Sequence, residues 1–484
     1  MDITYKILFV GYLSLIIYTV IHILLYTTTT PKALGYLLLV LLLPGVGMVI
    51  YFSFGLNFRH FSSRSKTVQA QTEFDETMRK QVSPAANSLP IASKAELDNF
   101  SSLIKFLKGI GNEPLHESFF TLLINGEKKF PEVLRVLASA KQFIHMEYYA
   151  WENDIRGNEI KDVLLRKAKE GVKVKVLYDD YASRKIKPNI VRELKAGGVS
   201  VIPRIKVKLA FLANRVNHRD HRKIIIVDGV TGFVGGINVS DRYDNSIDTG
   251  LYWRDTHVKI VGPLVGSLQR HFIVSWNSAQ SEKLTYTQDL FPDKMVDDPQ
   301  GVKAMGQVVA GGPVYPTSNI MLTYFKIFTL AKERIYITNP YFIPNDSILD
   351  ALKQAAISGV DVRIVVPYKS DSQMVGAAAK FYFPELVRAG VKIYLYKKGF
   401  VHAKTVVADS CLSVIGTANM DMRSFDLNFE IMSVIYGQEF GEQFEKAFLE
   451  DLKECMEVTN EMVSNASLLN RLFYSIARLM SSFL

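Results

Sequence analysis

Two short segments of the chain carry the same residue types at the same spacing. In each segment, a histidine is followed by a lysine after two positions, an aspartate after seven, a glycine after fourteen and an asparagine after seventeen. The members are His221, Lys223, Asp228, Gly235 and Asn238 in the first copy and His402, Lys404, Asp409, Gly416 and Asn419 in the second. With nine histidines in the chain, chance would give on the order of a few hundredths of one histidine-lysine-aspartate match. We therefore interpret the two copies as two halves of one site.

The residues of the paired motifs suit the chemistry of a phosphodiester. The groups that can hold its non-bridging oxygens are Lys223, Lys404, Asn238 and Asn419. One imidazole, of His221 or His402, can attack phosphorus while the other protonates the departing alkoxide. Neutral imidazole is available for attack because the ordinary pKa of histidine is about 6.5. A single motif could bind phosphate but could not supply both roles, so the duplication has a mechanistic reason.

Four acidic residues accompany the motifs. Asp255 follows the first motif and Glu430 follows the second, and we expect these carboxylates to fix the tautomers of the imidazoles, with a surface or structural acid as the alternative. The acids inside the catalytic motifs, Asp228 and Asp409, end strands. We expect them to hold turns and backbone in place more than to touch substrate.

No pattern of metal ligands competes with this interpretation. The sequence has no Cys-x2-Cys pair, no His-Glu-x2-His helix motif, no EF-hand loop and no Walker lysine. Gly235-Gly236 and Gly416-Thr417 instead indicate places where backbone approaches the site closely. We expect a reaction that needs no metal and no other cofactor.

The elements around the motifs follow from hydrophobic patterns. Residues 224–227 and 405–408 are short apolar runs that end in turn residues, which predicts buried strands. Histidine and lysine two residues apart at the start of such a strand point to the same side. Helical stretches end at Gly171 and Gly359, and alternating strands follow at 172–177 and 360–365. The chain is therefore predicted to contain two related α/β halves with largely parallel or mixed sheets, at 116–300 and 301–464, after a linker or peripheral segment at 57–115.

The first 56 residues are expected to anchor the chain in a membrane. Residues 7–26 and 33–54 are apolar runs of about twenty residues, which is the length that crosses a bilayer. The short connection between them predicts a transmembrane helical hairpin. A signal peptide is the alternative for the first run, but that run is too long and no small-x-small cleavage site follows it before the second run. Pro44, Gly45 and Gly47 leave open that the second run kinks or re-enters. Basic residues beyond the second run favour a multi-pass protein of the cell (inner) membrane with its N-terminus and catalytic region in the cytoplasm. The two cysteines fit a reducing compartment.

The net charge of +9 is concentrated in one region of the chain. Residues 184–223 hold twelve lysines or arginines against two acids. Directly before a phosphate-type motif, such a run favours anionic membrane lipid or an anionic substrate over nucleic acid or a solvated face. Residues 465–484 carry apolar side chains at helical spacing and predict an amphipathic helix, packed on the domain or lying in the membrane interface. The oligomeric state stays open, a homo-oligomer included.

The paired motifs resemble those of the phospholipase D superfamily, which is marked by two His-x-Lys-x4-Asp segments. The resemblance is closer to the bacterial cardiolipin synthase family within it. It is carried by the N-terminal apolar segments with Pro44-Gly45-Val46-Gly47, by Asn217-His218-Arg219-Asp220-His221-Arg222-Lys223 and by Trp253-Arg254-Asp255-Thr256-His257, and it covers nearly the whole chain. It implies two phospholipase D-like α/β halves that form one pseudo-twofold catalytic unit.

The resemblance also implies an activity. His221 would form a phosphatidyl-histidine intermediate and His402 would act as acid and then as base. Two phosphatidylglycerol molecules would be joined into cardiolipin with release of glycerol. The alternatives are another phosphatidyltransferase of this type, such as a phosphatidylserine synthase, a phospholipid hydrolase, or a basic membrane-binding scaffold without catalysis.

Overall fold

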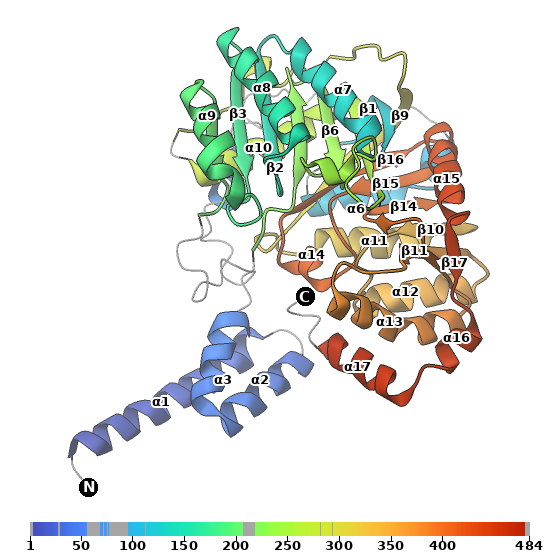
Figure 1. Ribbon diagram of the computed structural model, residues 1–484. Helices are drawn as coiled ribbons and strands as arrows, with labels where there is room; N and C mark the ends of the chain where they lie inside the picture. The colour runs from blue at the N-terminus through green and yellow to red at the C-terminus, as the bar shows by residue number, and fades with distance from the viewer. Residues whose placement is uncertain are drawn as a thin grey trace.

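The chain folds into two α/β halves that share one sheet, and a group of N-terminal helices lies outside them (Figure 1). The computed structural model describes residues 3–27, 30–55, 68–70, 72–74, 76, 95–111, 113–206, 218–280, 282–292 and 294–479. The predicted α/β class and its two related halves are confirmed.

The main sheet has 15 strands in the order β17-β12-β11-β10-β14-β15-β16-β9-β1-β8-β6-β5-β2-β3-β4. The first half supplies β1 (His116–Ile124), β2 (Phe143–Tyr148), β3 (Lys173–Tyr178), β4 (Ser200–Pro203), β5 (Lys223–Val227), β6 (Thr231–Gly235) and β8 (Thr256–Val261). The second half supplies β9 (Val302–Gly311), β10 (Arg334–Thr338), β11 (Asp361–Pro367), β12 (Lys392–Tyr396), β14 (Thr405–Ala408), β15 (Leu412–Gly416), β16 (Glu430–Tyr436) and β17 (Cys455–Glu457).

The strand order repeats outward from the junction of β1 and β9. These two strands pair antiparallel, with His116 opposite Gly306. Beyond β1, the next three strands of the first half are β8, β6 and β5; beyond β9, the next three strands of the second half are β16, β15 and β14. The outer strands β2, β3 and β4 run parallel, as do β10, β11 and β12. The motif strands β5 and β14 therefore occupy equivalent places in the two halves.

Helices cover the sheet on the sides where the strands are apolar. They include α7 (Asn125–Ser139), α8 (Ile155–Lys169), α9 (Arg192–Ala196), α10 (Val265–Ala279), α11 (Asn319–Leu330), α12 (Asp346–Ile357), α13 (Gln373–Arg388), α14 (Met422–Asp426) and α15 (Gln438–Leu452). The prediction that two helices end at glycine is confirmed, because Gly171 follows α8 and Gly359 follows α12, with φ of 89° and 93°. A residue without a Cβ adopts this left-handed conformation at little cost, which lets the chain turn directly into β3 and β11.

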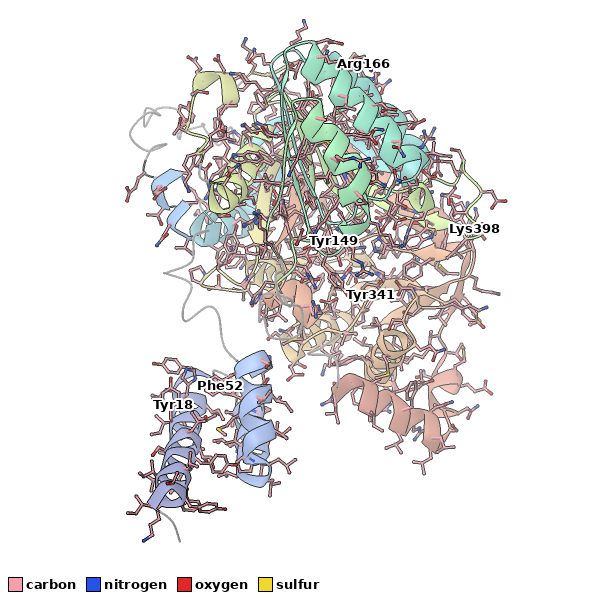
Figure 2. The ribbon with its side chains drawn as sticks, turned by 60° about the vertical axis from the view of Figure 1, so that its left-hand side comes forward. Tyr18, Phe52, Tyr149, Arg166, Tyr341 and Lys398 are labelled. Atoms are coloured by element: carbon pink, nitrogen blue, oxygen red, sulfur yellow. The ribbon has the colours of Figure 1, made fainter. Side chains whose placement is uncertain are left out.

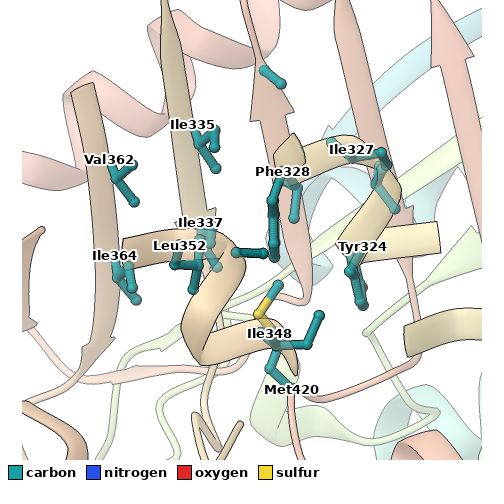
Figure 3. Close-up of a cluster of buried hydrophobic side chains, with 14 of the residues drawn as sticks. Tyr324, Ile327, Phe328, Ile335, Ile337, Ile348, Leu352, Val362, Ile364 and Met420 are labelled. Atoms are coloured by element: carbon teal, nitrogen blue, oxygen red, sulfur yellow. The ribbon is translucent and has the colours of Figure 1, made fainter. Parts of the chain in front are cut away.

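The core of the second half shows how helices and strands interlock (Figure 3). Tyr324 and Phe328 of α11 and Ile348 and Leu352 of α12 pack against Ile337 of β10 in one buried cluster. A separate cluster joins strands of both halves, and includes Phe120, Val308 and Ile435. Because this cluster lies between the halves, apolar burial holds the two motifs in a fixed relation.

Part of the segment expected to be a linker or peripheral segment packs on the second half. Residues 95–111 form α5 (Ala95–Asp98) and α6 (Ser101–Gly111). Leu103 and Leu107 of α6 are fully buried in the core of the second half. The apolar spacing of α6 gives it one face that packs on that core, so this stretch belongs to the second half in space although it precedes the first half in sequence.

The N-terminal helices differ from the expected pair of spanning helices. α1 (Ile3–Tyr26) is long and apolar enough to cross a membrane. The second apolar run is broken into α2 (Thr30–Leu42), α3 (Pro44–Ile50) and a short π-helical turn (Tyr51–Gly55). Pro44 starts α3 because proline lacks the N–H that would continue α2 and its ring clashes with the preceding turn. At about 1.5 Å per residue, α2 is too short for the bilayer core.

α3 folds back on α2. A Cβ on Gly47 would lie 2.6 Å from the backbone of Leu39, so only glycine allows this close approach. Tyr51 then returns beside Tyr36, with ring centroids 5.3 Å apart, and its hydroxyl lies 2.8 Å from Nδ1 of His22 near the end of α1. The second run therefore ends beside the C-terminal part of α1, at the same end from which it departed.

The C-terminal segment contains α16 (Asn460–Ser464) and α17 (Leu468–Leu479). The amphipathic helix expected within 465–484 is present, and α17 packs against α13 through Ala477 and Tyr474. Residues 480–484 lie outside the described residues, as do 207–217 of the basic run and most of 56–94.

Candidate active site

The two motifs place their histidines and lysines just at the start of equivalent strands. Lys223 is the first residue of β5, and Lys404 directly precedes β14. His221 and His402 are 8% and 7% exposed, and both lysines are fully buried. The local sequence explains this arrangement. Each apolar run that follows must lie in the sheet interior, and the histidine and lysine beside it are therefore buried as well.

Each imidazole contacts a carboxylate from the other half of the chain. Nδ1 of His221 lies 3.0 Å from both carboxylate oxygens of Glu430. Nδ1 of His402 lies 2.8 Å from Oδ2 of Asp255. The sequence indicated both acids, but their spacing within each half gave no sign that they would be exchanged.

Short backbone contacts between the halves produce the exchange. The N–H of His221 donates to the carbonyl of Phe429 at 2.9 Å, next to Glu430. The N–H of His402 donates to the carbonyl of Arg254 at 2.7 Å, next to Asp255. In the second case, β7 (Trp253–Arg254) and β13 (Phe400–Val401) form a small parallel sheet that holds the two segments together.

The carboxylates determine which imidazole nitrogen is free. A carboxylate offers no proton, so Nδ1 of each histidine donates to its acid and Nε2 keeps the lone pair. Burial lowers the pKa of His221 to about 4 and that of His402 to about 3. The charge of Lys404 contributes to the first shift and that of Lys223 to the second. Together with the exchanged carboxylate contacts, this mutual influence indicates that the two motifs form one site.

The lysines are held beside their histidines. Nζ of Lys223 donates to the carbonyl oxygen of His221 at 2.7 Å, and Nζ of Lys404 donates to the carbonyl oxygen of His402. Burial lowers the pKa of Lys223 to about 7 and that of Lys404 to about 8. Two buried ammonium groups are costly without an anion. A bound phosphodiester would add negative charge to that of Glu430 and Asp255.

The two asparagines differ in their surroundings. Asn238 accepts a hydrogen bond from the N–H of Ala150 and donates to the hydroxyl of Tyr243 at 2.6 Å. Among the described residues, Oδ1 of Asn419 is buried without a hydrogen-bond partner. A phosphate oxygen accepts hydrogen bonds, so either asparagine would hold it through Nδ2, and Asn238 would have to give up its bond to Tyr243 to do so.

Gly236 and Thr417 occupy equivalent positions beside the two carboxylates. The hydroxyl of Thr417 donates to Oε2 of Glu430 at 2.5 Å. A Cβ on Gly236 would lie 2.1 Å from Oδ1 of Asp255. The difference between the two positions has a steric reason. Asp255 leaves no room for a side chain at position 236, whereas Glu430 accepts a hydrogen bond from the hydroxyl at position 417.

Asp228 and Asp409 hold backbone. Oδ1 and Oδ2 of Asp228 accept hydrogen bonds from the N–H groups of Lys141, Gln142 and Phe143. Asp409 does the same for three consecutive residues that begin at Lys332. Each acid thus joins the end of a motif strand to the start of the neighbouring strand, which agrees with the turn-holding role expected from its position.

Three further side chains at the site were not predicted. The ring of Tyr149 packs edge-on against His221 with centroids 4.7 Å apart, and that of Tyr341 against His402 at 6.4 Å; both lie near the middle of the molecule (Figure 2). Lys129 is fully buried, and burial lowers its pKa to about 7. The sequence feature that could have indicated the tyrosines is that they follow the carboxyl ends of β2 and β10, where open α/β sheets bind ligands.

Among the described residues, no cluster of three or more His, Cys, Asp or Glu side chains could hold a metal ion.

A family model described as "Cardiolipin synthase, PLD-like domain" matches residues 133–273 and 324–452, and one described as "Phospholipase_D-nuclease N-terminal" matches residues 14–55. The crystal structure of phosphatidylserine synthase from Haemophilus influenzae Rd KW20 resembles this fold with a TM-score of 0.58 and 16% identity. It covers 79% of this chain and 98% of its own.

Relatives of known name are more similar in sequence. A cardiolipin synthase of Geobacillus kaustophilus is 39% identical over 446 residues, which cover 91% of this chain and 86% of the relative. Cardiolipin synthase 1 of Bacillus anthracis is 36% identical over 486 residues, with 98% and 94% covered. With this likeness along nearly the full length, and with two equivalent motifs joined in one site, the chain belongs to the cardiolipin synthase family.

Proposed function

We propose that this protein transfers a phosphatidyl group from one phosphatidylglycerol to another, which gives cardiolipin and glycerol. The observation that carries the proposal is the exchanged pairing of His221 with Glu430 and of His402 with Asp255. It provides two imidazoles with free Nε2 atoms and the same tautomer at one cationic site. Such a pair can act as nucleophile and as acid on a single phosphodiester.

In the first step, Nε2 of His221 attacks phosphorus. The P–N bond forms as the P–O bond to glycerol breaks, and His402 gives its proton to the departing oxygen. Glu430 stabilises the positive charge that develops on the His221 ring, since both of its oxygens lie 3.0 Å from Nδ1. His402 carries that proton because the bound phosphate anion and Asp255 both raise its pKa.

In the second step, the hydroxyl of another phosphatidylglycerol gives its proton to His402. Its oxygen then attacks phosphorus, the P–N bond breaks, and His221 regains its lone pair. Lys223, Lys404 and Asn419 hold the non-bridging oxygens through both steps. Water could replace the lipid hydroxyl, so a site at the membrane surface favours transfer over hydrolysis by limiting the access of water.

The position of the protein in the membrane is part of this proposal. α1 crosses the bilayer, and the folded-back pair of α2 and α3 re-enters from the side on which α1 ends. Basic residues follow this pair, including Arg59, Arg64 and Lys66, and favour a cytoplasmic location for the α/β halves. With one crossing, the N-terminus lies on the outer face.

An assay of both products tests the function. Phosphatidylglycerol labelled in its headgroup is incubated with the full-length protein in chelator. We expect free glycerol and cardiolipin to appear together, and His221→Ala and His402→Ala to abolish both. Phosphatidic acid without cardiolipin would identify a hydrolase, and unchanged activity in the histidine variants would rule out the proposed mechanism.

A further inference from the structure

A cavity of about 780 Å³ lies between α13, α16 and α17, lined by none of the residues of the active site. Its walls are largely apolar and include Phe383, Leu395, Met456 and Met462. Four cationic residues also line it, and none of the lining residues is acidic: the cations are Lys369, Lys380, Arg388 and Arg471. An apolar volume with only positive charge around it suits a ligand that has an anionic head and an apolar tail.

Three of the cations at this cavity have no acidic partner among the described residues. Within the part of the chain that the structure describes, no carboxylate lies in ion-pair distance of Lys369, Lys380 or Arg388, and all three residues are exposed. Arg471 donates to the carbonyl oxygen of Ser464 at 2.7 Å, which holds its guanidinium at the cavity. This charge is available to an anion from outside.

The helix that borders the cavity exposes an apolar face. α17 buries Ala477 against α13, and Arg478 stacks on the ring of Phe381 at 4.5 Å. Its large apolar side chains remain exposed, and they are Leu468, Leu469, Leu472, Phe473, Ile476 and Leu479. An amphipathic helix of this kind, with basic residues beside an apolar face, is typical of the membrane interface.

The placement of α17 agrees with contact to the membrane. α17 and the N-terminal helices lie at the same end of the molecule in two views turned by 60° (Figures 1 and 2). Because α1 is apolar enough to enter a bilayer, a membrane at this end would also meet α17. The apolar face and the cationic cavity would then be covered by the same lipid surface.

We propose that the cavity between α13 and α17 is a second binding site for an anionic phospholipid, separate from the catalytic centre. The phosphate binds Lys380, Arg388 and Arg471, the acyl chains enter the apolar volume, and the exposed face of α17 lies in the interface. The site holds the α/β halves against the membrane. It does not depend on the reaction proposed for the histidines.

Photolabelling of the full-length protein tests this site. The protein in phosphatidylcholine nanodiscs receives phosphatidic acid with a diazirine in its acyl chain, an anionic lipid without an alcohol headgroup to transfer. We expect labelled peptides within 373–396 and 455–479. Excess phosphatidic acid should compete, whereas phosphatidylcholine and inorganic phosphate should not.

Two pairs of charge reversals provide the matched comparison. Lys380→Glu with Arg388→Glu should reduce labelling of these peptides about tenfold, because each basic residue adds to the attraction of anionic lipid. Arg166→Glu with Lys446→Glu changes the net charge equally on α8 and α15, at exposed sites elsewhere, and should leave labelling intact. Ser475→Trp, which fills the cavity without a change of charge, should also reduce it.

Three results would overturn the proposal. They are absence of label from both regions, equal labelling by a phosphatidylcholine probe, and equal loss of labelling in the two charge-reversed pairs. Thermal unfolding of each variant shows whether the fold is retained, and Ser475→Trp keeps the test valid if charge reversal alone destabilises α13.

Discussion

Glu430 of the second half contacts Nδ1 of His221 of the first half through both of its carboxylate oxygens, at 3.0 Å. Asp255 and His402 form the reciprocal pair. Neither half therefore pairs its motif histidine with its own acid. The two halves must be assembled before either histidine has a fixed tautomer, which explains why duplication and close packing of the halves accompany this chemistry.

The exchanged pairing predicts which acid serves which step. With phosphatidyl-p-nitrophenol, whose leaving group needs no protonation, the initial burst of nitrophenol reports attack by the nucleophile alone. We expect Glu430→Gln to slow this burst about 10²–10⁴-fold, since loss of an orienting carboxylate has effects of that size in other enzymes. Asp255→Asn should leave the burst nearly normal and slow the reaction with phosphatidylglycerol.

The histidine variants provide the reference for the two acid variants in this experiment. Glu430→Gln should behave as His221→Ala does, and Asp255→Asn as His402→Ala does. If each acid instead followed the histidine of its own half, the exchanged contacts would have no catalytic meaning.

The motif acid Asp228 is expected to matter for stability more than for turnover. Asp228→Ala leaves three backbone N–H groups without their acceptor and places alanine at a φ of 52°, so we expect a loss of about 1–3 kcal/mol in unfolding free energy. Thermal unfolding and the activity of the remaining folded protein measure the two effects. Asp289→Ala, at an exposed position, is the control; a large fall in kcat at unchanged Tm would instead place Asp228 in the reaction.

The pKa shifts predict the dependence of activity on pH. The pKa of His221 is lowered to about 4, so its nucleophilic form is lost only as the pH falls through that region. The pKa values of Lys223 and Lys404 are lowered to about 7 and 8, so phosphate binding weakens as the pH rises through these values and the lysines lose their protons. We expect kcat/KM to fall above about pH 7 through a rise in KM, while kcat is less affected because bound phosphate keeps the lysines protonated. A KM that stays constant to pH 10 would contradict lysine binding of the phosphate.

The fold-back of α3 on α2 predicts the orientation of the N-terminus. After Cys411→Ser and Cys455→Ser, single cysteines are introduced by Lys6→Cys and by Lys32→Cys, with Ser139→Cys as a control on the α/β body. In right-side-out vesicles, a membrane-impermeant maleimide should label position 6 only; in inside-out vesicles it should label positions 32 and 139. Labelling of position 32 from outside, with position 6 protected, would mean that the second run crosses the membrane completely.

Much of this protein followed from local sequence. Apolar runs such as 224–227 and 405–408 had to be buried strands, and residues two apart on a strand share a side, so the histidine and lysine of each motif were predicted together. The glycines at 171 and 359 marked helix ends because they relieve a local backbone constraint. All of these properties depend on neighbours within a few positions of each other.

The tertiary structure decided what depends on residues far apart in the chain. His221 and Glu430 are 209 positions apart, and only the packing of one half on the other determined that each histidine would receive the acid of its partner. The same holds for α6, which is buried in the second half, and for the second apolar run, whose helices α2 and α3 pack on each other with Gly47 against Leu39. Composition and spacing determine which groups a chain must bury, but the contacts that bury them are chosen by the assembled fold.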